Sequence, residues 1–454
     1  MAHDPVPTLF ADALEQLQAE FASLPPVAEP ENTGSMERIL AETAHRLADN
    51  YPYFHPLYAG QMLKAPHPLA RAAYALAMAI NPNNHARDGG RASSEMEIEA
   101  VSQIAAIFDW PQHLGHLTSG GTFANLEALW IAGQLAPGKR IVGSEQAHYT
   151  HQRISSVLKL DYSSIPTDNR ARMDLSRLED ELKKGDVGTV VATMGTTAMA
   201  AVDPLDEIVA LRDKYGFRVH ADAAYGGYFR LIRDELEEPV RRAYEAMAQA
   251  DSIVVDPHKH GLQPYGCGCI LFRDPAVGRY YKHDSPYTYF TSNELHLGEI
   301  SLECSRPGAA AVALWATQRL LPPVVGGEFA QGLSKCRAAA LDLDRRLRTD
   351  SRFISLSAGS PDLDIVVWQV IGADPEEASA AAHRLFDACA TRDLHLALVQ
   401  LPHSWFVPSS AGENVLSSQN VTCMRSVLIK PEHAAWMDQI WERLVLAAGE
   451  LPGE

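Results

Sequence analysis

The feature that most constrains the fold is a regular alternation of short apolar runs and helical patterns between residues 115 and 272. The apolar runs are rich in Val and Ile, a composition that favours buried strands. They lie near residues 140–143, 187–194, 217–221 and 252–255, and helical patterns such as 174–184 and 204–215 separate them. This alternation predicts a mostly parallel sheet with helices on both faces, which binds ligands beyond the carboxyl ends of its strands.

The pattern changes after about residue 307 and predicts a second, smaller α/β unit. Its expected helices are 308–320, 327–349, 375–391 and 431–448, and its expected strands lie near 353–357, 364–371, 395–401 and 423–429. Two helix starts carry a capping pattern, because an Asp precedes a Pro and an acidic residue follows. These starts are Asp203-Pro204 and Asp374-Pro375.

Composition limits the classes of partner. The 454 residues carry 46% hydrophobic residues and a formal net charge of -18, which argues against nucleic acid or an anionic membrane as the main partner. No apolar run approaches the length of a transmembrane helix, and the first residues lack the regions of a signal peptide. The six cysteines show no paired framework, so we expect reduced, mostly buried thiols, no metal site and a cytoplasmic enzyme.

The stretch 251–260, DSIVVDPHKH, reads as a buried strand that ends at Pro257 and delivers Lys259 to its mouth. Poor solvation favours the neutral amine of a lysine, and a neutral amine can attack a carbonyl. We therefore predict that Lys259 holds an aldehyde cofactor as a Schiff base. The alternative is a solvated cation in a loop.

Residues 118–122, TSGGT, lie between an apolar run and the expected helix 123–132. Glycines allow a sharp turn, and the free N–H groups at a helix start attract an anion such as phosphate. The alternative is an ordinary tight turn.

Asp222 ends another apolar run and is followed by two alanines, which leave room for a flat ring. A carboxylate there would keep a pyridine nitrogen protonated and make the ring an electron sink. The alternative is an Asp that caps the next turn. His148 follows the run 140–143 and could stack on the ring, although a His at a helix start is often a cap or a surface residue.

Together, a phosphate-type turn, a ring-stacking His, a pyridinium-pairing Asp and a Schiff-base Lys compose a site for pyridoxal 5'-phosphate (PLP). The chain resembles the group II PLP-dependent amino-acid decarboxylases, of the fold-type I superfamily. The matching segments are TSGGTFAN at 118–125, AH at 147–148, GTT at 195–197, HADAA at 220–224, DPHK at 256–259 and SRPGA at 305–309.

The resemblance implies a large domain with a mostly parallel seven-stranded sheet flanked by helices, and a smaller C-terminal α/β domain. It divides the chain into an N-terminal helical and extended segment at 1–70 that packs on a partner subunit, a PLP-binding domain at 71–320 and a small domain at 321–454. The family builds its active site at a dimer interface, which implies a homodimer.

The resemblance also implies roles for single residues. Lys259 would bind the cofactor covalently, Asp222 would pair with the ring nitrogen, and His148 and Ala224 would lie on opposite ring faces. The remaining cofactor contacts would come from His258, Gly120, Gly121 and Thr122 at the phosphate, from Thr196 near the ring substituents and from Ser305.

The proton donor to the product is expected from a tyrosine after the lysine, where the chain has SPYTYFTS at 285–292. We favour Tyr289 over Tyr287. Candidate substrate contacts are His55, Tyr58, Asn84, His85, Tyr287 and Arg306. Arg306 could pair with a carboxylate, or form a structural ion pair across subunits.

The resemblance predicts release of carbon dioxide and an amine from an L-amino acid that the sequence does not identify. His260 follows Lys259 where members specific for aromatic amino acids usually carry Trp, and this version is more similar to archaeal tyrosine/aspartate decarboxylases and sphingosine-phosphate lyases. An aldehyde lyase or an aminotransferase on the same scaffold is the enzymatic alternative. A catalytically silent scaffold is the alternative from another class, although a scaffold would need neither Lys259 nor Asp222.

Overall fold

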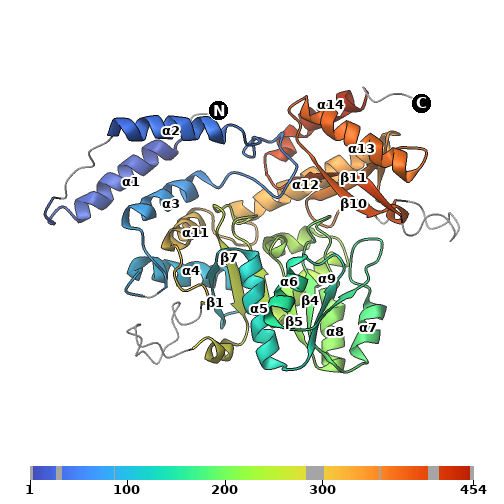
Figure 1. Ribbon diagram of the computed structural model, residues 1–454, viewed down its shortest axis with the longest axis horizontal. Coiled ribbons are helices and arrows are strands. Elements are labelled where there is room, and N and C mark those ends of the chain that lie inside the picture. Colours follow the sequence, from blue (N-terminus) through green and yellow to red (C-terminus); the bar gives the residue numbers. More distant parts are fainter. Residues whose placement is uncertain are drawn as a thin grey trace.

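The computed structural model describes residues 4–26, 33–85, 87–282, 301–356, 359–406 and 419–449. Its described elements form two α/β units, one below the other in Figure 1, and two helices at the N-terminus that lie beside them. Among the helices of these residues, none is at once long enough and apolar enough to cross a bilayer.

The larger unit is built on a seven-stranded sheet with the order β1-β7-β6-β5-β4-β2-β3. Only β7 runs antiparallel to its neighbours. Its strands are β1 (Leu114–Thr118), β2 (Arg140–Ser144), β3 (Tyr162–Ile165), β4 (Val187–Thr193), β5 (Arg218–Asp222), β6 (Ser252–Val255) and β7 (Gly268–Phe272). The expectation of a mostly parallel, seven-stranded sheet is confirmed.

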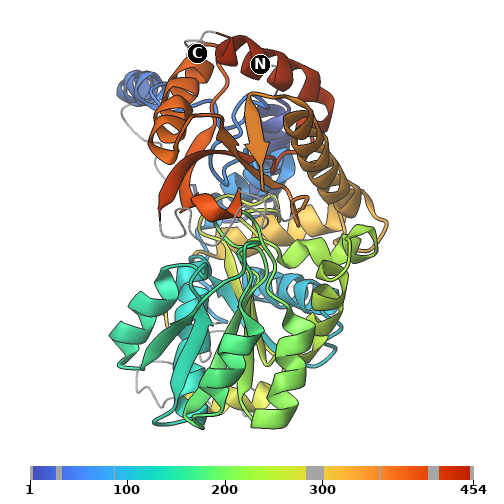
Figure 2. The same ribbon diagram turned by 90° about the vertical axis from the view of Figure 1, so that its right-hand side faces the viewer.

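Helices cover both faces of this sheet (Figure 2), so its central strands are buried on both sides. Alternate residues of β6 show the two faces: Val254 packs with Ala124 and Ala128 of α5 (Gly121–Leu135), whereas Ile253 and Val255 belong to the opposite core. The opposite core also receives α4 (Arg91–Ile107), α7 (Leu175–Leu182), α8 (Leu205–Tyr215) and α9 (Val240–Ala246). The remaining helices of this unit are α3 (Pro68–Ile80), α6 (Thr150–Leu158), α11 (Gly308–Leu320), η1 (Gly227–Glu235), η2 (Met247–Gln249) and η3 (Pro275–Tyr280).

The smaller unit holds a four-stranded antiparallel sheet with the order β10-β11-β9-β8. Trp368 of β9 is fully buried in its core. The strands are β8 (Phe353–Ser355), β9 (Ile365–Val370), β10 (Ala397–Pro402) and β11 (Asn420–Val427), and the helices are α12 (Glu328–Thr349), α13 (Pro375–Ala390), α14 (His433–Ala448) and η4 (His403–Trp405).

Polar side chains join the two units next to the carboxyl end of β4. Arg425 of β11 donates to the carbonyl oxygens of Thr197 at 2.6 Å and Ala198 at 3.0 Å. Asp362 accepts from Arg172 at 2.6 Å and from the backbone N–H of Val202 at 3.0 Å. These contacts hold the small sheet against the loop that follows β4.

The N-terminal helices α1 (Val6–Glu20) and α2 (Thr33–Leu47) are the least buried part of the described chain. α1 packs against α3, and no described side chain of α1 or α2 is buried.

One of the two expected helix starts is correct. Asp374 caps α13, because its carboxylate accepts from the backbone N–H groups of Glu376 and Glu377, both at 2.9 Å. The expected cap at Asp203 is wrong: Pro204 takes the capping position, and the Asp203 carboxylate accepts instead from the N–H groups of Met173 and Thr193. Burial raises the pKa of Asp203 to about 7.

The expectation of mostly buried thiols is confirmed, because all six cysteines are free and five are buried. The described ranges contain no group of three or more metal-ligating side chains.

Candidate active site

A cavity of about 390 Å³ lies beyond the carboxyl ends of the parallel strands of the large sheet. The predicted residues in its wall come from loops that follow four different strands, because parallel strands end at the same edge. They are Gly120, Gly121 and Thr122 after β1, His148 after β2, Asp222 and Ala224 at β5, and His258 and Lys259 after β6. The structure therefore brings together eight of the ten cofactor contacts that the sequence predicted.

Lys259 lies in the turn that follows β6 and reaches the cavity with a side chain that is 21% exposed. Its Nζ atom lies 2.9 Å from the Oδ2 atom of Asp256, whose side chain is only 3% exposed. Asp256 thus orients the amine. Asp256 belongs to the DPHK motif at 256–259, but its contact with Lys259 is visible only in the folded chain.

The turn after β1 is shaped for close approach by a ligand. Gly120 has φ 157° and ψ 174°, a conformation that is largely restricted to glycine. A Cβ atom on Gly121 would lie 2.7 Å from Asp256, so a side chain at this position would collide with it. α5 starts directly after this turn, and its first N–H groups attract an anion.

The Asp222 carboxylate lies deep in the cavity and is held by two side chains. Its Oδ2 atom lies 2.7 Å from His151 Nε2 and accepts from Asn125 Nδ2 at 3.3 Å. Burial acts to raise the pKa of Asp222, but the hydrogen bond from His151 and the positive charge nearby outweigh it. The pKa of Asp222 is therefore held well below its usual range, and the carboxylate stays charged.

A second buried histidine fixes the orientation of Asn125. His220 Nε2 lies 2.8 Å from Asn125 Oδ1, and His220 Nδ1 lies 2.9 Å from Ser252 Oγ. An ionised carboxylate only accepts hydrogen bonds, so Asn125 turns its amide N–H toward Asp222 and its oxygen toward His220. Burial lowers the pKa of His220 to about 3, so the ring is neutral and donates from Nε2 while Ser252 donates to Nδ1.

His148 lies at the entrance to α6 and lines the cavity. Its Nδ1 atom lies 2.8 Å from Thr150 Oγ1, which sets the plane of the ring. Burial and the nearby Lys259 lower the pKa of His148, although Asp222 opposes them. A neutral imidazole held in this way can cover one face of a flat ring.

Two predicted cofactor contacts lie elsewhere in the described chain. Thr196 is fully buried, and its Oγ1 atom accepts from the backbone N–H of Ala201, whereas its neighbours Gly195 and Thr197 line the cavity. Ser305 is exposed and its Oγ atom accepts from Asn83 at 3.2 Å. Their roles at the cofactor stay predictions from the resemblance.

The structure does not bring the candidate substrate contacts into this cavity. His55 packs against Trp436 with ring centroids 4.9 Å apart. Tyr58 is 4% exposed, and its hydroxyl accepts from the N–H of Gln61. Tyr287 and Tyr289, the candidate proton donors, lie outside the described residues.

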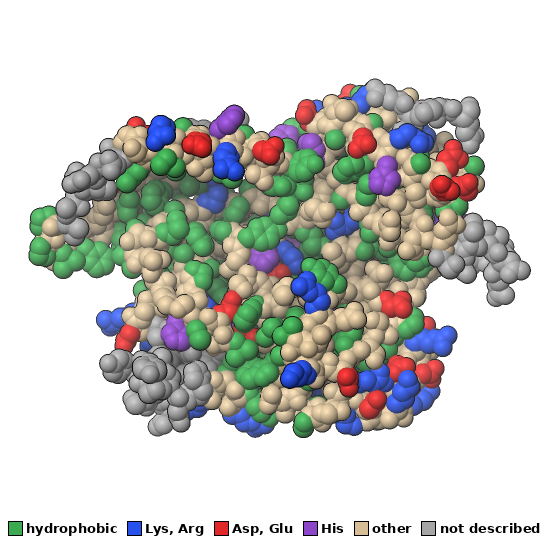
Figure 3. All heavy atoms as spheres, viewed as in Figure 1, with side chains coloured by type: hydrophobic (Ala, Val, Ile, Leu, Met, Phe, Trp, Pro, Cys, Tyr) green, Lys and Arg blue, Asp and Glu red, His purple; other side chains and the backbone are tan. Residues whose placement is uncertain are grey.

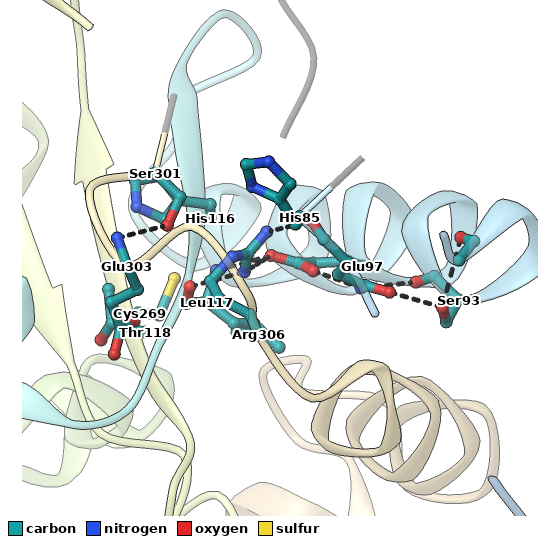
Figure 4. Close-up of polar contacts among 12 residues, drawn as sticks. His85, Ser93, Glu97, His116, Leu117, Thr118, Cys269, Ser301, Glu303 and Arg306 are labelled. Atoms are coloured by element: carbon teal, nitrogen blue, oxygen red, sulfur yellow. Dashed lines mark hydrogen bonds and ion pairs between the residues drawn. The ribbon is translucent and has the colours of Figure 1, made fainter. Parts of the chain in front are cut away.

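Arg306 and Asn84 lie in a separate buried network, and the half-buried His85 lies beside it (Figure 4). Arg306 pairs with Glu97 at 2.6 Å and donates to the carbonyl oxygen of Leu117 at 2.8 Å, while Asn84 donates to the other Glu97 oxygen at 2.6 Å. The ion pair therefore lies within one subunit. It ties the start of α11 to α4 and β1 rather than facing the cavity.

Figure 4 also shows Glu303, which reaches the turn after β1. Both of its carboxylate oxygens accept from the backbone N–H of Ser119, at 3.0 and 3.2 Å. Ser119 lines the cavity, so a negative charge lies beside the candidate phosphate site. No sequence pattern predicts this contact, because Glu303 and Ser119 lie 184 positions apart.

The residues of the cavity fit PLP. The turn after β1 and the start of α5 suit its phosphate, and Asp222 suits its ring nitrogen. Two buried atoms at the same end of the cavity, Asp256 Oδ1 and His258 Nδ1, have no hydrogen-bond partner among the described residues. Lys259 supplies an amine for its aldehyde.

Solved structures share the fold of this chain. A crystal structure of Oryza sativa TDC with PLP and tryptamine superimposes with a TM-score of 0.78 at 19% identity, covering 100% of this chain and 99% of that chain. A crystal structure of mouse CSAD gives a TM-score of 0.78 at 21% identity, with 97% and 92% covered.

A family model described as the pyridoxal-dependent decarboxylase conserved domain matches residues 131–370, more than half of the sequence. The chain belongs to the pyridoxal-dependent decarboxylase family.

Curated relatives carry names of the same kind. An L-tyrosine decarboxylase of Enterococcus faecium is 28% identical over 392 residues, which cover 64% of this chain and 64% of that enzyme. A probable L-tyrosine/L-aspartate decarboxylase of Methanothermobacter thermautotrophicus is 28% identical over 323 residues, which cover 70% of this chain and 84% of that protein. The chain thus matches less than two thirds of the length of the Enterococcus enzyme.

Replacement of Asn125 by Ala removes a donor to Asp222 and leaves the buried His220 without its acceptor. A hydrogen bond to a charged group contributes about 1.5–3 kcal/mol, so we expect the dissociation constant for PLP to rise about tenfold or more. Titration of cofactor-free protein with PLP, followed by visible absorption, measures this. Asn50→Ala, at an exposed position, is the matched control. An unchanged constant in Asn125→Ala would contradict the role of the network.

Replacement of Glu303 by Gln keeps an acceptor for Ser119 but removes the negative charge. Because a carboxylate beside the phosphate site repels a dianion, we expect PLP to bind about fivefold more tightly, the effect of roughly 1 kcal/mol. The same titration measures it, with the exposed Glu99→Gln as control. Weaker binding in Glu303→Gln would show that the carboxylate supports the site instead.

Proposed function

We propose that this chain is a PLP-dependent carboxy-lyase that converts an L-amino acid to the corresponding amine and carbon dioxide. The single observation that carries the proposal is the meeting of Lys259 and a charged Asp222 in one cavity. Membership of the decarboxylase family supports the same reaction.

Bound PLP supplies an aldehyde for the substrate amine and a ring that accepts the electrons of the breaking bond. Lys259 Nζ would hold the aldehyde group until the substrate amine replaces it. Asp222, whose pKa is held well below its usual range, would stay charged and favour a proton on the ring nitrogen. His148 would cover one face of the ring, and Gly120, Gly121 and Thr122 would hold the phosphate.

The substrate is an L-amino acid in this proposal, and the names of the relatives suggest tyrosine and aspartate as the first two to test. The proton that replaces carbon dioxide is proposed to come from Tyr289 or Tyr287. An aldehyde lyase or an aminotransferase would use the same cavity but would not release carbon dioxide.

A homodimer is proposed as the working form, in which the N-terminal segment packs on the partner subunit. Seven large apolar side chains of this segment are between 47% and 68% exposed: Leu9, Phe21, Leu24, Met36, Ile39, Leu40 and Leu47. Figure 3 shows hydrophobic side chains gathered over α1 and α2. Patches of this kind mark protein interfaces. We also propose that this dimer works in the cytoplasm.

The reaction is tested by supplying the loaded enzyme with single L-amino acids and measuring carbon dioxide and amine together. We expect equal amounts of both from at least one amino acid. Lys259→Ala should abolish turnover, and Asp222→Asn should lower kcat at least a hundredfold, because the ring nitrogen loses its charged partner. Lys139→Ala, a substitution in the loop before β2, is the control. Formation of a keto acid without carbon dioxide would refute the decarboxylase and favour an aminotransferase, and formation of an aldehyde without carbon dioxide would favour an aldehyde lyase.

The dimer is tested by light scattering after gel filtration. We expect twice the chain mass for the native protein and a monomer for the double variant Ile39→Asp, Leu40→Asp, because two charges would be buried in the interface. Asp49→Ala, in the turn after α2, is the control. A native monomer that is fully active would contradict the proposal.

A further inference from the structure

A second cavity, of about 410 Å³, lies on the other side of the turn that carries Lys259. It is formed by four separate parts of the chain: the segment before and at the start of α3, the turn at His260, the start of α12 and the residues between β11 and α14. No described residue lines both this cavity and the candidate active site.

Three lysines line the second cavity without an acidic partner in the described part of the chain: Lys335 is exposed, Lys64 is half-buried and Lys430 is buried. Lys430 is 3% exposed and donates to the carbonyl oxygen of Tyr58 at 2.6 Å, and Lys64 donates to the carbonyl oxygen of Ile429 at 3.3 Å. Within the described ranges, neither amine lies at ion-pair distance from a carboxylate. Buried cations are normally paired, so this arrangement lacks a counter-ion.

The charge of Lys64 acts on Lys430. Burial, and then the neighbouring charge of Lys64, lower the pKa of Lys430 to about 7, and burial lowers the pKa of Lys64 as well. An anion between them would relieve both effects.

Three further nitrogen atoms in the wall of the cavity are buried and without a hydrogen-bond partner in the described part of the chain. They are Nε of Arg71 and both ring nitrogens of His260, of which Nε2 lies 3.3 Å from Asp364 Oδ2. The His260 side chain is 1% exposed, while the Arg71 head group already pairs with Asp4 at 2.8 Å. Unsatisfied buried polar atoms are costly, which again points to a ligand with acceptor atoms.

The rest of the wall is mostly apolar, with Leu262, Phe329 and Leu333 among its residues. The two acidic residues of the lining, Glu328 and Glu432, are exposed and lie at its rim. This combination suits a molecule with one anionic group and an apolar body, rather than an inorganic ion alone.

We propose that this second cavity binds a small organic anion, whose carboxylate or phosphate group lies between Lys64 and Lys430 and whose apolar body packs on Phe329 and Leu333. The site is next to the catalytic lysine in the chain. His260 Nε2 lies 3.3 Å from Asp364, which accepts from the hydroxyl of Tyr225 at 2.7 Å, and Tyr225 lines the candidate active site. A shared polar wall therefore separates the two cavities.

Calorimetric titration of the PLP-loaded protein tests the site with three probes: benzoate, phenyl phosphate and the neutral benzyl alcohol. We expect at least one of the two anions to bind once per chain and benzyl alcohol not to bind. The tighter anion identifies the head group. Binding of neither anion would overturn the proposal, because the lysines would then be neutral donors to backbone carbonyls only.

Variants distinguish this cavity from the active site. Lys430→Met and Lys64→Met should each weaken the anion at least tenfold without changing the visible absorption of bound PLP, and both should fold, since they remove an unpaired buried charge. Glu432→Gln, at the rim, should tighten binding about twofold because a repelling charge is lost. Lys183→Met, on an exposed surface, is the control. Equal binding by Lys430→Met, Lys64→Met and the native protein would overturn the site.

Discussion

The proposed chemistry of this chain depends on one buried charge, the carboxylate of Asp222. A carboxylate at 5% exposure would normally take up a proton, because burial disfavours its charged form. His151 at 2.7 Å and Asn125 at 3.3 Å reverse this preference by hydrogen bonds to the charged form. Their own positions depend on the parallel sheet, which brings α5, α6 and the end of β5 to the same edge.

The same edge also brings the remaining parts of the site together. Lys259 follows β6 and the glycine turn follows β1, so the amine and the candidate phosphate site lie on one side of Asp222. On the other side, Arg425 of the small unit holds the loop after β4 by two backbone carbonyl groups. A change in that junction would therefore move Thr197, which lines the cavity, without touching Lys259.

Much of the fold could be predicted because its signals are local. The Val- and Ile-rich run 252–255 coincides with β6, and the expected helix 308–320 coincides with α11. The predicted helix cap at Asp203 is wrong, because an Asp can either cap a helix or accept hydrogen bonds from distant backbone N–H groups. Only the folded chain shows that the Asp203 carboxylate accepts from Met173, thirty positions earlier.

The candidate site was predictable where a residue follows a strand and less so where it acts through another residue. Lys259 and Gly120 follow strands and Asp222 ends one, so we could expect the three residues to lie close together. His220 lies within the strand β5. The HADAA motif to which it belongs does not show that it orients Asn125, which belongs to α5. The ion pair of Arg306 within one subunit could not be predicted, because its partner Glu97 lies more than two hundred positions away.

The central claim is that Lys259 is the residue that binds PLP. Borohydride reduction of the loaded protein, followed by peptide mass spectrometry, tests it directly, because reduction makes the bond between lysine and cofactor permanent. The account predicts one reduced cofactor per chain, attached to the peptide that contains Lys259. Attachment to another lysine such as Lys430 or Lys64 alone, or no attachment at all, would contradict it.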